Sequence, residues 1–161
     1  MNTSGPYNGH GQKQRDLVRM SPSEVDDFLH EGRTLTMCTL LADGSVHAIG
    51  MWYGFLDGKL ALESKAKAQK VLNLRRDPRI TCLVETGKTY EELRGVSVIG
   101  TAEIVEDTDR LWQIGVSVFD RNSGPYSDEA APLVQAMLNK RVGIVVHPRK
   151  IVSWDHRKLG L

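Results

Sequence analysis

The sequence predicts a small antiparallel β-barrel accompanied by helices, a mainly β fold of the α+β class. Two Asp-Gly pairs, Asp43-Gly44 and Asp57-Gly58, separate stretches in which apolar and polar residues alternate. An Asp-Gly pair between such stretches is a strong signal of a β-hairpin. One short helical stretch and then longer alternating stretches follow the hairpins, and this order favours a closed or partly closed barrel.

The N-terminal residues are expected to form a tail and then one helix. Residues 1–19 begin with many Gly, Asn and Gln residues, so we interpret them as a flexible N-terminal tail and assign residues 20–161 to a single domain. The sequence Ser-Pro-Ser-Glu at 21–24 is a capping box with proline at the first helical position. Gly32 is expected to end this helix.

The remaining elements follow from the periodicity of the apolar residues. Alternation predicts strands at 35–41, 46–55, 59–63, 80–85, 96–106, 142–147 and 151–154. Apolar residues at helical spacing predict two further helices, at 108–119 and 131–139. The helices are therefore few and short, and strands dominate the domain.

The clearest functional signal is a lysine-rich helix that Ser64 is expected to cap and Pro78 to end. Lys65, Lys67 and Lys70 fall in its first two turns, where the helix dipole is already positive, and each exposed cation there costs about 0.3–1 kcal/mol. Such a placement suits a bound anion, because free backbone N–H groups and ammonium groups converge on it. We therefore predict a phosphate site here, with a solvated lysine-rich helix face as the alternative.

Composition and charge limit the class of partner. A chain of 161 residues with a net charge of +1 suits one domain and has no global basic field for nucleic acid. No stretch approaches the roughly 18 apolar residues of a membrane span, and residues 1–19 are too polar for a signal sequence, so we expect a cytoplasmic protein. Cys38 and Cys82 lie in alternating stretches and are expected to be buried free thiols. No Cys or His stands at ligand spacing, so no metal site is expected.

Three motifs, in this order, resemble the split β-barrel flavin-binding superfamily that includes pyridoxamine 5′-phosphate oxidase. They are the Asp-Gly hairpin leading into residues 51–53 (Met-Trp-Tyr), the helix end at 70–79, and Arg-Gly-Val-Ser-Val-Ile-Gly at 94–100. The closing segment at 153–159 is typical of members that use the deazaflavin coenzyme F420. The resemblance covers residues 35–161 and implies one split β-barrel domain with the FMN-binding fold of the pyridoxamine 5′-phosphate oxidases.

The resemblance also implies where a cofactor would bind. Contacts to the flavin-type ring are expected from the second strand, at Ala48, Ile49, Gly50, Met51 and Tyr53. Contacts to the phosphate are expected from the end of the third strand and the next helix, at Glu63, Ser64, Gln69 and Lys70, with Lys65 and Lys67 assisting. His47 and Trp52 would border the substrate pocket. For His47 the alternative is a surface position, and for Trp52 and Tyr53 it is ordinary core packing.

One departure from the family pattern bears on the choice of cofactor. Pyridoxamine phosphate oxidases carry Arg-Gln-Val-Arg-Val-x-Gly where this chain has Gly95 and Ser97 in place of the glutamine and the second arginine. The glutamine that meets flavin is therefore missing, and vitamin B6 oxidation is disfavoured. The resemblance favours F420 over FMN, and the acidic tail of F420 suits the additional lysines.

The resemblance implies a reductase that passes a hydride from reduced F420 (F420H2) to an unsaturated or quinone-like small molecule. Hydride transfer requires the protein to orient cofactor and substrate and does not require a nucleophile. The sequence offers no nucleophile elbow, so no catalytic residue is assigned. The alternatives are an FMN-dependent oxidoreductase of the same fold and a non-catalytic protein that binds flavin or F420. A homodimer is expected, because the sites of this family lie between two subunits.

Overall fold

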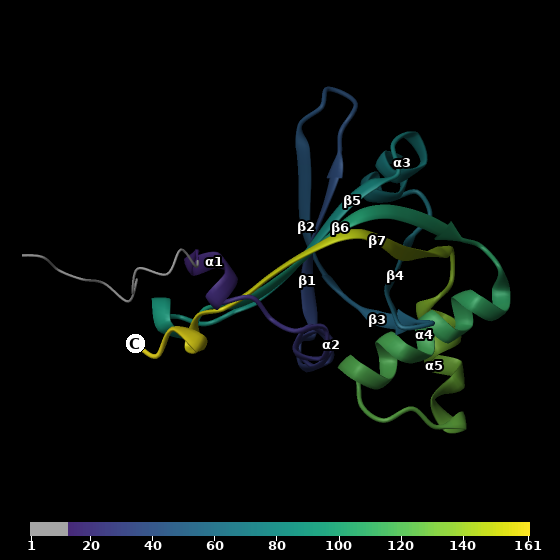
Figure 1. Ribbon diagram of the computed structural model, residues 1–161. Helices are drawn as coiled ribbons and strands as arrows, with labels where there is room; N and C mark the ends of the chain where they lie inside the picture. Colours follow the sequence, from purple (N-terminus) through teal and green to yellow (C-terminus); the bar gives the residue numbers. More distant parts are fainter. Residues whose placement is uncertain (1–12) are drawn as a thin grey trace, which may run out of the picture.

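The computed structural model describes residues 13–161, and Figure 1 shows their arrangement. The helices are α1 (Gln14–Leu17), α2 (Pro22–Glu31), α3 (Gln69–Arg76), α4 (Thr108–Asn122) and α5 (Ala131–Met137), with short 3₁₀ turns η1 (Tyr90–Glu92), η2 (Asp128–Ala130) and η3 (His156–Leu159). The strands are β1 (Thr34–Leu40), β2 (Val46–Trp52), β3 (Gly54–Leu56), β4 (Lys59–Lys65), β5 (Arg79–Thr86), β6 (Arg94–Val105) and β7 (Arg141–Asp155).

All seven strands belong to one antiparallel sheet with the order β2-β1-β5-β6-β7-β4-β3. The sheet curls into a half-barrel, which confirms the predicted split β-barrel of the α+β class. The long strands β6 and β7 form its central pair and run through the whole molecule (Figure 1). Helices α4 and α5 lie together at one end of this pair, and α1 lies near the C-terminus at the other end.

The predicted strand at 46–55 is divided in two by the structure. β2 pairs with β1 as far as Trp52, and β3 pairs with β4 from Gly54 onward. The chain therefore crosses at Tyr53 from one edge of the sheet to the other. Gly54, directly after the crossing, lets α4 approach closely, because a Cβ atom there would lie 2.5 Å from the Ser117 Oγ atom of α4.

The two predicted closing strands form one continuous strand, β7. Its pairing with β6 shifts register between Ile99 and Gly100, opposite Pro148. A Cβ atom on Gly100 would lie 2.0 Å from the carbonyl oxygen of His147, so glycine lets the two backbones approach at this irregularity. Proline is tolerated inside a long strand where a bulge interrupts the ladder of hydrogen bonds, so Pro148 does not end the strand.

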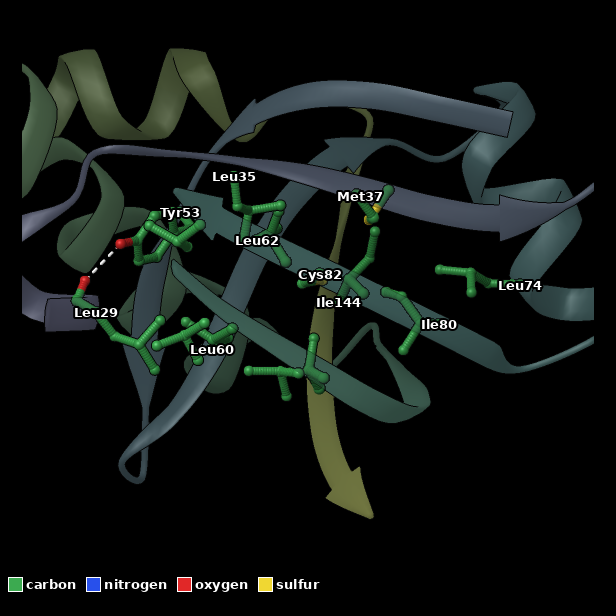
Figure 2. Close-up of a cluster of buried hydrophobic side chains, with 14 of the residues drawn as sticks. Leu29, Leu35, Met37, Tyr53, Leu60, Leu62, Leu74, Ile80, Cys82 and Ile144 are labelled. Carbon is green, nitrogen blue, oxygen red and sulfur yellow. Dashed lines mark hydrogen bonds between the residues drawn. The ribbon is translucent and has the colours of Figure 1, made fainter. Parts of the chain in front are cut away.

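The main core lies inside the curl of the sheet, and Figure 2 shows most of it. It combines alternate residues of the strands with the inner face of α2, and includes Leu29, Leu35, Met37, Tyr53, Leu60, Leu62, Ile80, Cys82 and Ile144. Cys82 is a buried free thiol, as predicted, and burial raises its pKa to about 12. Cys38 is also free but only half-buried. A smaller core lies between α4 and the sheet, with residues from β3, β4, β6 and β7.

Regular structure begins nearer to the N-terminus than the sequence suggested. Residues 1–12 of the expected tail lie outside the described residues. From residue 14 the chain forms α1, and the side chain of Val18 is buried. The Val18 carbonyl accepts a 2.7 Å hydrogen bond from the Asp155 backbone N–H, which ties this segment to the end of β7. The prediction of a flexible tail reaching residue 19 is therefore wrong for its last residues, because Val18 buries apolar surface.

The predicted helices that start after Ser21, at 108–119 and at 131–139 are confirmed, with small differences at their ends. In the capping box of α2, the Glu24 N–H donates to the Ser21 Oγ, and the Ser21 N–H donates to the Glu24 carboxylate. α4 is longer than predicted and reaches Asn122, whereas α5 is shorter. Across residues 13–161, no helix is both long and apolar enough to span a membrane.

Candidate functional site

The strand β2, from which the ring contacts were expected, is an edge strand of the sheet. Its register places His47, Ile49 and Met51 on the face that β1 turns to the core, opposite Thr39, Met37 and Leu35. These three side chains are nevertheless only half-buried or exposed, since nothing in the described residues pairs with the outer edge of β2. The backbone and side chains of β2 are therefore available to a ligand or to a second subunit.

Tyr53 does not belong to this open surface, and its predicted contact with a flavin-type ring is wrong. Its side chain is fully buried, and its hydroxyl donates a hydrogen bond to the Leu29 carbonyl (Figure 2). The physical reason is the crossing of the chain described above, which turns Tyr53 into the core. The alternative of core packing is therefore confirmed for Tyr53. Trp52 is 54% exposed and remains a candidate for the substrate pocket.

The expected lysine-rich helix begins later than predicted. Ser64 and Lys65 still pair with Val142 and Arg141 of β7, so β4 continues through the predicted first turn of the helix. Ser64 is buried in the strand and is not an N-cap; helix α3 begins at Gln69 without a capping side chain. Sheet pairing has overridden the local capping preference of serine.

This shift leaves only one lysine at the N-terminus of the helix. Lys65 and Lys67 precede α3, and only Lys70 lies in its first turn. The dipole argument therefore applies to Lys70 alone. The remaining basis for an anion site is the local density of cations, to which the structure adds Arg141 through its pairing with Lys65.

Lys70 belongs to a partly buried group of three charges with Glu63 and Arg141. The Arg141 Nη1 atom lies 2.8 Å from the Glu63 Oε2 atom, and these side chains are 29% and 11% exposed. Burial raises the pKa of Glu63, while Arg141 and Lys70 oppose that shift. Burial and the charge of Arg141 lower the pKa of Lys70, which Glu63 partly offsets. The group thus has two cations for one carboxylate, and an added anion would relieve the imbalance.

The opposite face of α3 carries a buried polar network. Gln69 Nε2 donates to Asn73 Oδ1 at 2.8 Å, and Asn73 Nδ2 donates to Thr39 Oγ1 at 3.1 Å. Asn73 and Thr39 are both buried, and Thr39 is the cross-strand partner of His47. The network therefore fixes α3 against β1 and brings Gln69 to the side of the molecule that carries β2.

His47 provides an independent indication of a ligand. Its Nδ1 atom is buried and has no hydrogen-bond partner among residues 13–161. A buried polar atom left unpaired costs about 1–3 kcal/mol, and a neutral imidazole nitrogen can either donate or accept. A polar group of a ligand beside β2 would satisfy it. The residues at this strand thus fit a flavin-type cofactor.

The structure divides the predicted site residues into two groups on the two sides of α3. His47, Ala48, Ile49, Gly50 and Met51 lie on β2, with Gln69 linked to them through the polar network. Glu63, Lys65, Lys67 and Lys70 lie at the end of β4 and the start of α3. Figure 1 shows α3 beside the upper part of the sheet. Ser64 and Tyr53 point into the core and belong to neither group.

Sequence reasoning missed two sets of residues. Asn73 stands on the apolar face of α3 beside Val71 and Leu74, and a lone polar residue there is a readable signal of a buried contact. Lys140 and Arg141 gave no signal, because about 75 residues separate them from the lysines that they approach through the pairing of β4 with β7.

The sequence pattern of the pyridoxamine 5′-phosphate oxidase family matches residues 21–155, so the chain belongs to that family. The match covers nearly all of the half-barrel described above. It agrees with the resemblance that the hairpin, the helix end and residues 94–100 indicate.

Solved structures extend the comparison. The conserved hypothetical protein Rv2991 of Mycobacterium tuberculosis is 53% identical, with a TM-score of 0.90 over 93% of this chain and 94% of that one. An F420 reductase is 26% identical, with a TM-score of 0.59 over 78% of this chain and 94% of that one. HutZ, the haem storage protein of Vibrio cholerae, shares the fold at 18% identity and a TM-score of 0.64, over 82% and 94%. No curated protein matches the sequence.

Proposed function

We propose that this protein is an F420H2-dependent oxidoreductase that transfers a hydride from the reduced deazaflavin to an unsaturated or quinone-like small molecule. Two features carry the proposal: the open edge strand β2, where His47 Nδ1 has no partner among residues 13–161, and the basic segment at the end of β4 and the start of α3. An elongated cofactor with a polar ring and a phosphate matches this pair of surfaces. The family and the similarity to an F420 reductase support the same proposal.

The preference for F420 over FMN has its own structural support at Gly95. A Cβ atom there would lie 2.1 Å from the Trp154 ring, so that ring occupies the space that a longer side chain would need. The glutamine that meets flavin in pyridoxamine phosphate oxidases has no room at this position unless Trp154 moves. An FMN ring would therefore lose a polar contact, and a different flavin-like ring becomes the better ligand.

The chain's own residues would hold and orient the cofactor. Backbone groups of Ala48 and Gly50 would face the ring, His47 would bond to a polar ring atom, and Lys70 would hold the phosphate. The bound deazaflavin supplies the hydride, and the protein supplies position and exclusion of water. Cys82 is buried, and its pKa of about 12 keeps it a thiol, so it is no nucleophile.

We further propose a homodimer in which the outer face of the sheet is the interface. Two rows of paired residues cross β2, β1, β5, β6 and β7 on this face: Ala48, Cys38, Thr81, Ile99 and Lys150, and Gly50, Thr36, Leu83, Ser97 and Val152. All ten are half-buried or exposed, and nine are uncharged. A sheet face on which nine of ten residues are uncharged matches the composition of a dimer core, and β2 would carry the cofactor at its border.

The proposal is tested by following the oxidation of F420H2 by its returning absorbance, with menadione as the quinone probe. We expect oxidation to accelerate only when protein and menadione are both present. Reduced FMN in place of F420H2 tests the FMN-dependent alternative. A rate no faster with the protein than without it, for both cofactors, would contradict an oxidoreductase and favour the non-catalytic binding protein.

A further inference from the structure

A cavity of about 370 Å³ lies along α4, between the helix and the loop that follows it. Its lining residues are Trp112, Gln113, Val116, Ser117, Asp120 and Tyr126. None of them belongs to the residues on β2, at the end of β4 or in α3 to which the cofactor is assigned. The volume falls within the roughly 300–1,000 Å³ of small-molecule sites, so the cavity can hold a ligand of its own.

Two aromatic rings form a corner of this cavity. The ring centres of Trp112 and Tyr126 lie 6.4 Å apart, and the ring planes are 82° apart. Phe119 supports Tyr126 from a second direction, at 6.4 Å and 89°. A group in the corner between Trp112 and Tyr126 can therefore contact the faces of both rings. The face of an aromatic ring carries partial negative charge and attracts a cation.

The loop that carries Tyr126 is fixed to α4. The Tyr126 backbone N–H donates to the Asp120 Oδ1 atom at 2.9 Å, and Gly124 reverses the chain with a φ of 119°. The helix is fixed in turn to the sheet, because the Ser117 Oγ atom accepts a 2.9 Å hydrogen bond from the Phe55 backbone N–H of β3. The aromatic corner is thus formed before any ligand binds.

Asp120 supplies a negative charge to the cavity, and no cation among residues 13–161 forms an ion pair with it. Its neighbour Arg121 donates instead to backbone carbonyls at the end of α2 and at the crossing between β2 and β3. Asp128 and Glu129, which closely follow Tyr126, are exposed and also lack an ion pair in this part of the chain. The charge of this surface therefore favours a positively charged ligand.

We infer that the aromatic corner binds a small organic cation with an alkylated ammonium group, of the trimethylammonium type. The methyl groups of such a cation need no hydrogen bonds and pack against Trp112, Tyr126 and Val116, while its charge faces the rings and the Asp120 carboxylate. A metal ion suits the corner less, because it requires several oxygen ligands and Asp120 is the only carboxylate in the lining. This site does not depend on which cofactor the protein uses.

The test titrates the isotope-labelled full-length protein with choline at constant ionic strength and follows the indole N–H signal of Trp112 by NMR. Trp112→Phe assigns the signal. We expect a saturable shift with a dissociation constant of about 1 mM, because two ring faces and one exposed carboxylate each contribute modestly. The neutral isostere of choline, 3,3-dimethylbutan-1-ol, is expected to bind at least about tenfold more weakly.

Two variants separate the charge from the rings. Asp120→Asn keeps an oxygen that can accept the Tyr126 N–H and removes the charge, so it is expected to weaken choline binding about fivefold. Tyr126→Leu removes one ring face and is expected to weaken it by about the same factor. Glu91→Gln, at an exposed acid of η1 outside the cavity lining, is the matched charge control and is expected to have no effect.

Three results would each overturn the inference. The first is the absence of a saturable shift of the Trp112 signal at choline concentrations up to about 50 mM. The second is equal binding of the neutral isostere, because the cavity would then select apolar groups and not cations. The third is choline binding to Asp120→Asn as tight as to the unchanged protein, with the helix content of the variant intact by circular dichroism.

Discussion

At the scale of single residues, Lys70 is the cation on which the phosphate assignment depends. It is the only one of the three predicted lysines in the first turn of α3, and it shares a partly buried charge group with Arg141 and Glu63. A charge-assisted contact to phosphate contributes about 1.5–3 kcal/mol, so Lys70→Ala is expected to weaken binding of F420 by about ten- to hundredfold. Fluorescence titration measures this, with Lys88→Ala, at an exposed lysine outside the site, as control. Unchanged affinity would move the phosphate elsewhere.

A second residue-scale prediction concerns side chains that hydride transfer would not require. If the protein acts by positioning, Cys38→Ala, Cys82→Ala and His47→Ala are each expected to leave the turnover number within about tenfold of the unchanged protein. His47→Ala is expected to weaken cofactor binding, because its Nδ1 atom would lose its ligand partner. A thousandfold fall in turnover for any of them, with folding and cofactor affinity intact, would assign that residue an acid, base or nucleophile role.

At the scale of secondary-structure elements, Arg121 joins three of them. From α4 its guanidinium donates to the carbonyls of Leu29, His30 and Gly32 at the end of α2, and to the carbonyl of Tyr53. It also lies 4.8 Å and 4.7 Å from the ring centres of Tyr53 and Phe55. The side chain therefore caps α2 and holds it against the crossing between β2 and β3.

We expect Arg121→Met to lower the free energy of unfolding by about 2–4 kcal/mol, because several partly buried carbonyls lose their donor. Arg121→Lys keeps the charge but cannot span the carbonyls with one planar group, so it is expected to recover less than half of that loss. Urea denaturation measures both variants. A loss below about 1 kcal/mol for Arg121→Met would show that packing alone positions α4.

The element scale also shows how far sequence patterns reach. The capping box at Ser21 and the Asp-Gly turns are local signals, and the structure confirms the elements they predicted. Ser64 offered a local capping signal that was wrong, because pairing with Val142 of a strand far along the chain extended β4. Tyr53 alternates in sequence like its neighbours, and only the crossing between sheet edges shows that it is buried. Long-range pairing, which no local pattern encodes, decided both cases.

At the scale of the whole molecule, the family motifs predicted the half-barrel, whereas the grouping of the site residues depended on the strand order. β2 and β4 are separated by four strands in the sheet, and α3 links their surroundings through Asn73 and Lys70. The pairing of Arg141 with Lys65 escaped prediction for the same reason, because the two residues come from opposite halves of the chain. The sequence predicted the function to the level of the family, and the positions of the basic residues near α3 support a more specific proposal for the cofactor.

The proposed dimer is a prediction at this scale. Light scattering of the full-length protein at micromolar concentration is expected to give twice the mass of one chain. Leu83→Glu, on this largely uncharged outer face, is expected to yield monomers, because a buried unpaired carboxylate is strongly unfavourable. Leu133→Glu places the same charge on an exposed leucine of α5 and serves as the matched control. A strict monomer for the unchanged protein would contradict a site built between two subunits.

The proposed function requires that the open strand β2 and the basic segment at the start of α3 together bind F420 in preference to FMN. The most direct test is to titrate the cofactor-free protein with each compound separately and to follow cofactor fluorescence. We expect saturable binding of F420, at least tenfold tighter than that of FMN. A protein that purifies yellow with tightly held FMN, and leaves the fluorescence of added F420 unchanged, would contradict it.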